Sequence, residues 1–339
     1  MRITRRRFVI VSAALGALAL GCAFAQPAGK VPVLAYVTAA GAASDLAVAK
    51  PGSPLQTLVS RLRELGWEEG RTIVIERHSA EGRLDRAQAI FADLAARKVD
   101  LIYTSGTVGG QQMPLEALRA TRSIPIVFVG GGSDPVARGI VASLAKPGGN
   151  ATGFSVYIGY DFVLKRLQLL KEIAPRIQRV AFLETKTDFE RYIDQVRTGL
   201  AQLGVTPILA AVESADDYEQ AFATAMRERA DAVFVPSTPV HRQHAPRIIA
   251  LAAKHRLPAE YFFRESVEAG GLAAYGVDMQ ELSRRSAGYV DRILRGANPG
   301  ELPVERPSKF ELAINLKTAR VLGLVVPQSV LLRADRVIE

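Results

Sequence analysis

Cysteine is nearly absent from this 339-residue chain, because Cys22 is the only one and it lies among the first 25 residues. Without those residues the protein has no disulfide and no thiol chemistry, which suits an oxidising compartment without requiring one. Histidine is also scarce, with four in the chain. This scarcity argues against a secreted enzyme, which needs a nucleophile, a base and a group that orients the base.

Catalytic and metal-binding motifs are missing as well. The sequence has no G-x-S-x-G elbow, no Walker loop and no G-x-G-x-x-G after its first apolar segment. Residues 106–110 (GTVGG) have the wrong spacing for a dinucleotide site. His241 and His244 are three residues apart, but no third ligand lies nearby, and calcium loops are absent. We predict no catalytic residue, no metal and no cofactor.

The positive charge does not point to nucleic acid. The net charge is +9, but residues 1–25 hold four arginines and no acid, which leaves +5 for the remainder. The other charges are interspersed, and no basic run contains interleaved aromatic residues. Nucleic-acid binding therefore has no support in the sequence.

The N-terminal residues predict an export signal, residues 1–25. An arginine-rich start precedes the apolar run Phe8–Leu20, which is too short to span a bilayer. Ala23-Phe24-Ala25 is typical of a cleavage site, so the mature periplasmic protein is expected to begin at Gln26. A retained membrane anchor is the alternative.

Two further alternatives concern the kind of signal. Residues 4–9 (TRRRFV) resemble the twin-arginine export motif, although an arginine-rich Sec signal has the same appearance. Leu20-Gly21-Cys22 resembles a lipoprotein cleavage site, and cleavage after Ala25 is the interpretation favoured here.

Apolar strand-like runs alternate with helical patterns along the rest of the chain, which predicts βαβ units and parallel sheets. In the first half the expected strands are 31–38, 72–78, 101–105 and 126–129, and the helices are 55–65, 84–97 and 111–121. In the second half the strands are 180–184, 207–213, 232–236 and 259–263, and the helices are 162–173, 189–203, 218–229 and 245–254. The last pieces, 272–277, 282–294, 310–315 and 316–322, are too few for a third core.

The predicted fold is therefore α/β, with two doubly wound parallel-sheet domains joined by a hinge of several crossings. The turn-rich segment Pro147–Asn150, followed by Thr152-Gly153, is the expected boundary. The N-terminal lobe would comprise residues 31–153 plus about 269–305, and the C-terminal lobe 154–268 plus about 306–339. Crossings near 153, 268 and 306 would allow the lobes to close on a ligand.

Ligands bind at the carboxyl ends of parallel strands, which selects the candidate binding residues. Hydroxyls, free N–H groups, glycines and an acidic side chain occur at these positions, and an aromatic ring there can stack on a flat ligand. For several of these residues a structural role is the alternative: Ser105, Thr107 and Asp134 as helix caps, and Tyr261 as a core residue. The candidate ligand-binding residues are Tyr36, Ser105, Gly106, Thr107, Gly131, Ser133, Asp134, Ser237, Thr238 and Tyr261.

Several stretches, spread over the chain after the export signal, resemble the ABC-transporter substrate-binding family typified by the periplasmic tryptophan- and phenylalanine-type binding proteins of bacteria. They are Leu62–Trp67 with Glu69-Gly70, Ile124–Phe128, Ser133–Val136, Leu144–Asn150, Thr152–Phe154, Leu251–Ala259, Val267–Leu272 and Lys309–Ala319. The resemblance implies a type I periplasmic-binding-protein fold, no catalysis, a small organic ligand and an ABC permease in the inner membrane as partner. We further expect a monomer.

The resemblance does not identify the ligand. Residues 109–112 (GGQQ) and the widened Gly130-Gly131-Gly132 depart from the family pattern where the ligand is expected, so an aromatic amino acid is not assumed. An amino-acid-like ligand remains one candidate. Two other functions stay open: a periplasmic ligand-sensing module with the same fold, and a secreted α/β enzyme.

Overall fold

The computed structural model describes residues 30–339 except residues 40, 48–52, 109–110 and 131–133. The predicted export signal lies outside the described residues. The chain separates into residues 1–31 and the unit Pro32–Glu339, and the account below concerns that second unit. Within the described part of the chain, no helix has both the length and the apolar character needed to cross a membrane.

The first sheet contains five parallel strands in the order β2-β1-β3-β6-β7. Each strand follows a helix or turn, as expected for doubly wound units. Their bounds are β1 Val33–Thr38, β2 Val74–Ser79, β3 Leu101–Ser105, β6 Ile126–Gly130 and β7 Ala151–Ser155. β7 was not expected as a strand, because residues 147–153 were interpreted as a turn-rich boundary.

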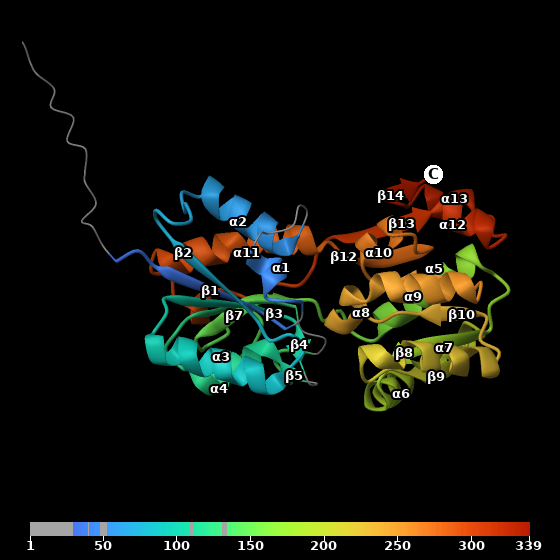
Figure 1. Cartoon of the computed structure of the whole chain (residues 1–339), viewed down its shortest axis with the longest axis horizontal. Helices are drawn as coiled ribbons and strands as arrows, with labels where there is room; N and C mark the ends of the chain where they lie inside the picture. The colour runs from blue at the N-terminus through green and yellow to red at the C-terminus, as the bar shows by residue number, and fades with distance from the viewer. Residues whose placement is uncertain (1–29, 40, 48–52, 109–110, 131–133) are drawn as a thin grey trace, which may run out of the picture. The chain divides into compact units, whose positions relative to one another are not determined.

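Helices cover both faces of this sheet, as Figure 1 shows. On one face α2 (Pro54–Glu64) and α11 (Met279–Leu294) pack on Leu34, Tyr36 and Val127. On the other, α3 (Leu84–Arg97) and α4 (Met113–Ala120) pack on the intervening residues of the same strands. Alternate residues of a strand point to opposite faces, so β1 contributes to both cores.

The second sheet contains seven strands in the order β14-β13-β12-β11-β10-β8-β9. Neighbouring strands are parallel except β12 and β13, which are antiparallel, so this sheet is not wholly parallel as predicted. Their bounds are β8 Arg179–Glu184, β9 Thr206–Ala211, β10 Ala232–Phe234, β11 Ala259–Tyr261, β12 Ala273–Val277, β13 Phe310–Asn315 and β14 Arg336–Ile338.

This sheet is also covered on both faces. α5 (Asp161–Ile173) and α6 (Lys186–Gln202) pack on one face, together with α12 (Leu316–Val321) and α13 (Gln328–Leu331). α7 (Tyr218–Arg227) and α9 (Ala245–Lys254) pack on the other. Shorter helices lie in the connections of the chain: α1 (Ser44–Ala47) between β1 and α2, α8 (Pro239–Gln243) between β10 and α9, and α10 (Arg264–Glu268) between β11 and β12.

The chain passes from one sheet to the other three times along the described residues, as the sequence predicts, but one passage lies elsewhere. β12 pairs with β11 and β13, so it belongs to the second sheet and not to residues 269–305 of the first lobe. The passage expected near residue 268 therefore follows Val277 and begins α11 at Asp278. Glu305 forms a bridge with Phe154 of β7, which places the third passage between Glu305 and Phe310.

Candidate functional site

Ser105 is the last residue of β3, and Tyr36 lies two residues before the end of the neighbouring strand β1, with its ring in the core. The Tyr36 ring stacks on that of Tyr103, with centroids 5.3 Å apart and planes 15° from parallel. Burial raises the pKa of the Tyr36 phenol, while a hydrogen bond with Ser105 and the charge of Arg242 act in the opposite direction. The phenol is therefore held as a neutral hydrogen-bonding group at this edge of the sheet.

The segment after β3 differs from the helix start that was expected. Thr107 lies in the two-residue strand β4 (Thr107–Val108), which pairs antiparallel with β5 (Gln111–Gln112). The carbonyl of Gly106 accepts a 3.2 Å hydrogen bond from the N–H of Met113, where α4 begins. Gly106 and Thr107 thus introduce a hairpin between strand and helix.

Asp134 follows β6 and orders the turn after it. One oxygen, Oδ1, accepts hydrogen bonds from the N–H groups of Val136 at 2.8 Å and Ala137 at 3.3 Å. Asp134 therefore orders a turn and does not cap a helix as the alternative expected, and ligand contact by Asp134 stays a prediction. Gly131 and Ser133, the other two candidates of this loop, lie outside the described residues.

The candidates of the second sheet have different surroundings. Thr238 Oγ1 accepts a 3.1 Å hydrogen bond from the N–H of His241 and so caps α8, while Ser237 is exposed. Tyr261 is 2% exposed and belongs to the core between the sheet and helices α7 and α9. The placement of Tyr261 matches the alternative of a core residue.

Arg242 was not selected as a candidate from the sequence, but its positive charge lies near candidate residues of both sheets. Its Nη2 atom lies 3.0 Å from Glu265 Oε1, and its guanidinium carbon lies 4.8 Å from the centroid of the Phe263 ring. Its side chain retains 32% exposure, and its charge acts on Tyr36 of the first sheet. An arginine held between a carboxylate and an aromatic ring can bind a carboxylate or another planar anion.

Glu184, also missed, ends β8 and is only 4% exposed. Its Oε1 accepts a 3.2 Å hydrogen bond from the N–H of Thr185. Burial raises the pKa of this carboxyl to about 8, and the negative charge of Asp188 adds to the rise. The sequence does carry a signal for Glu184, because an acidic residue ends a strand whose middle is apolar (RVAFLE). Groups with strongly shifted pKa values concentrate at functional sites.

Three tyrosine rings form a row of contacts near α5 and α6: Tyr157 and Tyr160 precede α5, and Tyr192 lies within α6. The rings of Tyr157 and Tyr160 are 6.2 Å apart, those of Tyr160 and Tyr192 are 5.3 Å apart, and both pairs are 83° from parallel. Burial raises the pKa of Tyr157, and Tyr160 and Asp134 raise it further. In such edge-to-face pairs the positive edge of one ring meets the negative face of the other.

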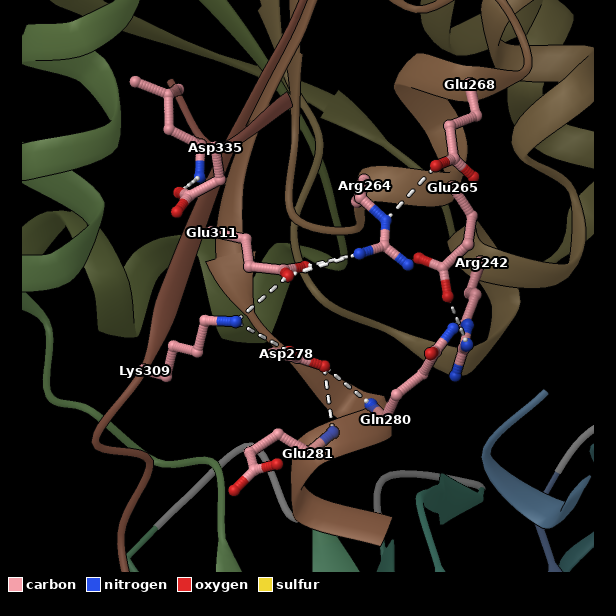
Figure 2. A network of polar contacts seen from close by, with 11 residues as sticks. Arg242, Arg264, Glu265, Glu268, Asp278, Gln280, Glu281, Lys309, Glu311 and Asp335 are labelled. Atoms are coloured by element: carbon pink, nitrogen blue, oxygen red, sulfur yellow. Dashed lines mark hydrogen bonds and ion pairs between the residues drawn. The ribbon is translucent and has the colours of Figure 1, made fainter. Parts of the chain in front are cut away.

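A polar network joins two of the three passages between the sheets (Figure 2). Lys309 Nζ lies 3.5 Å from Asp278 Oδ2 and 3.8 Å from Glu311 Oε1. Arg264 Nη1 lies 3.1 Å from Glu311 Oε2. Asp278 also caps α11, accepting from the N–H groups of Gln280 and Glu281. The segments that begin α11 and β13 are therefore held together by charge.

No group of three or more metal-ligating side chains occurs among the residues for which positions are described. The groups described above are hydroxyls that can form hydrogen bonds, aromatic rings, and charged side chains that occur singly or in ion pairs. This set of groups can bind a small molecule but contains no triad of nucleophile, base and orienting residue.

Comparison with known proteins identifies the family. Residues 54–338 match the family model of the ABC transporter substrate binding protein, so the chain belongs to that family. It is a substrate-binding protein of the ABC type, with the two α/β sheets of a type I periplasmic binding protein. The family is one of binding proteins rather than catalytic ones.

Individual relatives agree with this assignment. The chain is 26% identical over 268 residues to a tyrosine-binding protein of Clostridioides difficile (strain R20291), covering 78% of this chain and 75% of the relative. It is similar in structure to a conserved domain protein from Vibrio cholerae, with TM-score 0.79, 25% identity and coverage of 91% and 100%. It also resembles an ABC domain from Streptococcus pneumonia in complex with L-Trp, with TM-score 0.78, 23% identity and the same coverage.

Proposed function

We propose that the protein captures a small, amino-acid-like molecule at the carboxyl ends of its two sheets and delivers it to an ABC permease in the inner membrane. The export signal expected in residues 1–25 would place the mature protein in the periplasm, where it acts as a monomer. The family is one of substrate-binding proteins, which supports a role in binding rather than in catalysis.

The observation that carries this proposal is the position of Arg242, which lies between Glu265 and the Phe263 ring and whose charge acts on Tyr36. Arg242 belongs to α8 beside the second sheet, while Tyr36 of β1 and its partner Ser105 at the end of β3 belong to the first sheet. A ligand carboxylate can accept from the guanidinium of Arg242 and from the hydroxyl groups of the first sheet. Charge-assisted hydrogen bonds of this kind are about twice as strong as neutral ones.

The choice of an amino-acid-like ligand rests on the same residues and on the relatives. A carboxylate suits Arg242, and the ring of Phe263 suits an apolar or aromatic side chain. One relative is described as a tyrosine-binding protein, and one similar structure is in complex with L-Trp. Both observations support the same class of ligand for this chain.

A thermal-shift screen of the purified mature chain tests the proposal. The probes are the twenty amino acids and the aromatic acids benzoate and phenylacetate. A ligand that binds only the folded state stabilises it by about 2.7 kcal/mol at 100 times its dissociation constant, so the melting temperature rises. We expect a rise with at least one amino acid. No rise with any probe would contradict the proposed function.

Two arginines allow a matched test of the carboxylate contact. Arg242 and Arg247 each pair with a glutamate and each lie over an aromatic ring. Only Arg242 acts on Tyr36, whereas Arg247 belongs to α9 beside α7. We expect Arg242→Gln to weaken binding of the selected amino acid at least tenfold and Arg247→Gln to change it less than twofold, both measured by calorimetry.

Closure around the ligand is a further part of the proposal. A ligand that contacts both sheets favours the closed form by its differential affinity for the two forms. Small-angle scattering with and without the saturating amino acid should show a smaller radius of gyration when the ligand is present. An unchanged radius would favour a rigid, preformed pocket.

A further inference from the structure

The ion pairs of Lys309 lie where two of the three passages between the sheets run side by side. β12 ends at Val277 and β13 begins at Phe310, and these two residues face each other in the antiparallel register. The next pair in that register consists of Asp278 and Lys309, one step beyond the sheet. Figure 2 shows these two side chains with the charged groups around them.

Lys309 contacts one acidic group on each side of the passage. Asp278 caps α11, which packs on the first sheet, by accepting hydrogen bonds from the N–H groups of Gln280 and Glu281. Glu311 belongs to β13 of the second sheet. Lys309 Nζ lies 3.5 Å from Asp278 Oδ2 and 3.8 Å from Glu311 Oε1. One ammonium group thus spans the point where the chain passes from one sheet to the other.

The two carboxylates repel each other when that ammonium group is removed. The side chains of Asp278 and Glu311 are each only 13% exposed, so water and salt screen their charges poorly. Burial raises the pKa of Glu311, and the charge of Asp278 raises it further, whereas Arg264 and Lys309 lower it. Arg264 holds Glu311 to α10, which packs on β12 and β13. Lys309 is the cation that the two carboxylates share across the passage.

A weak contact is sufficient to act at such a place. Lys309 retains 57% exposure, and an exposed ion pair changes an equilibrium by up to about fivefold. This factor is small beside the equilibrium constant of unfolding, but it decides between two arrangements of a hinge that are similar in free energy. The described residues 306–309 lack regular secondary structure, and hinges are built from a few such residues at the ends of elements.

We propose that Lys309 is an electrostatic latch, which holds Asp278 to Glu311 and so fixes the orientation of the two sheets relative to each other when no ligand is bound. Without the latch the two carboxylates separate, and the passages that contain Asp278 and Lys309 adopt other dihedral angles. The latch needs no ligand and therefore goes beyond the proposed function.

Distances between spin labels on helices of the two sheets test the latch. Residues 26–339 contain no cysteine, so cysteines introduced into the mature chain are labelled specifically. One label pair joins exposed Ala92 of α3 to exposed Ala223 of α7, and the other joins exposed Ser60 of α2 to Ala223. Two pairs are used because a rotation about one axis can leave a single distance unchanged. Double electron–electron resonance without ligand measures both distance distributions.

Variants of Lys309 give the expected result and its control. In Lys309→Met, the ratio of the parent's major distance to the other distances should fall by about two- to fivefold in at least one label pair. Lys309→Arg keeps the charge and should give the distributions of the parent protein. Lys317→Met removes an exposed lysine from α12 of the second sheet, so it is the matched control and should also behave like the parent.

A double variant separates charge from packing. Asp278→Asn keeps an oxygen that can cap α11 but removes the repulsion, so in the Lys309→Met background it should reverse at least half of the change. Parent distributions in Lys309→Met would overturn the latch. A full change that persists in the double variant would overturn it as well, because Lys309 would then act through packing.

Neither of these outcomes touches the proposed function, which the thermal-shift screen decides on its own. Because Lys309 is more than half exposed, melting curves of Lys309→Met should resemble those of the parent protein. If that variant folds poorly, Lys309→Gln takes its place with the same expected fall in the ratio of distances.

Discussion

The indole Nε1 of Trp67 donates a 2.8 Å hydrogen bond to Oδ1 of Asp291, a residue 224 positions further along the chain. Trp67 follows α2, and Asp291 lies on α11, which comes after five strands of the second sheet. Arg295 adds an ion pair to Asp291 at 2.7 Å and lies over the Trp67 ring. This contact attaches the returning helix to the first sheet.

Replacing Asp291 by Ala should therefore destabilise the first sheet. The change leaves a half-buried indole N–H without its acceptor, which costs about 1–3 kcal/mol of unfolding free energy. Trp67 is the only tryptophan, so its fluorescence during urea unfolding reports on this region. Asp291→Asn keeps an acceptor and should lose less than Asp291→Ala. Equal midpoints for the parent and the Ala variant would contradict the structural role.

The ion pair between Arg166 and Glu260 is a second point of stability, in the core of the other sheet. Arg166 Nη2 lies 2.6 Å from Glu260 Oε2, and both side chains are almost completely buried. Arg166 also donates to the carbonyl of Val235, and Glu260 accepts from the N–H of Tyr275. The pair thus links α5 to three strands of the sheet.

Removing one member of this pair leaves the other charge buried and unpaired. We expect Arg166→Met to lower the unfolding free energy by about 3–5 kcal/mol, and the double variant Arg166→Met/Glu260→Met to lose less than the sum of its single changes. The exposed pair of Arg197 and Asp194 is the control, since Arg197→Met should cost less than about 1 kcal/mol. Denaturant unfolding followed by circular dichroism measures the parent protein, the two single variants, the double variant and Arg197→Met.

Most of the fold could be predicted from apolar periodicity, because strands and helices here follow local patterns. α3 and β13 occur at the predicted residues. β7 could not be recognised, because its short segment contains Gly153, which a period-two pattern does not favour. That glycine has a tertiary reason: a Cβ atom there would lie 2.0 Å from the carbonyl oxygen of Phe128. The pairing of β12 with β11 and β13 could not be predicted from the sequence either, because it depends on residues distant in the chain.

The candidate site was only partly accessible to the same reasoning. Strand ends can be located from the sequence, and Ser105 does end β3, whereas Tyr36 lies two residues before the end of β1 and Thr238 caps α8 beyond β10. Whether a side chain at a strand end points inward depends on its phase in the sheet, which is why Tyr261 lies in the core. Arg242 was missed because its relation to Tyr36 exists only in the folded chain.

His241 makes the stability depend on pH. It is buried, its Nδ1 atom lies 2.8 Å from the hydroxyl of Tyr218, and its Nε2 atom lies 2.7 Å from the carbonyl oxygen of Leu183. Nε2 therefore carries the proton and donates to Leu183, while Nδ1 accepts from Tyr218. Burial lowers the pKa of His241 to about 4. The unfolded chain, with a pKa near 6.5, binds more protons between these values.

The contribution of His241 to stability should accordingly fall as the pH falls from about 6.5 towards 4, and it is fully present above that range. The linkage relation gives a loss of about 2 kcal/mol between pH 7 and pH 5 from this group. Urea unfolding of the parent protein and of His241→Gln at both pH values isolates this contribution, because the difference in unfolding free energy between the two proteins should shrink by that amount from pH 7 to pH 5. His255→Gln is the control and should leave the loss unchanged, because His255, which follows α9, is not among the groups that act on His241.

Gly276 and Gly288 offer a comparison of two glycines near the second passage between the sheets. Gly276 lies in β12, and a Cβ atom there would lie 1.9 Å from the carbonyl oxygen of Phe262. Gly288 lies in α11, with nothing within 4 Å of such an atom. The strand that leads to Asp278 therefore approaches the backbone at Phe262 more closely than any side chain allows.

Gly276→Ala should destabilise the protein by more than about 2 kcal/mol, because backbone atoms must move to admit the methyl group. Gly288→Ala should stabilise it by about 0.5–1 kcal/mol, since alanine is favoured over glycine inside a helix. Thermal unfolding of both variants decides the point. If Gly276→Ala melts at the temperature of the parent protein, β12 is not packed against Phe262 as described, and the passage at Asp278 must begin differently.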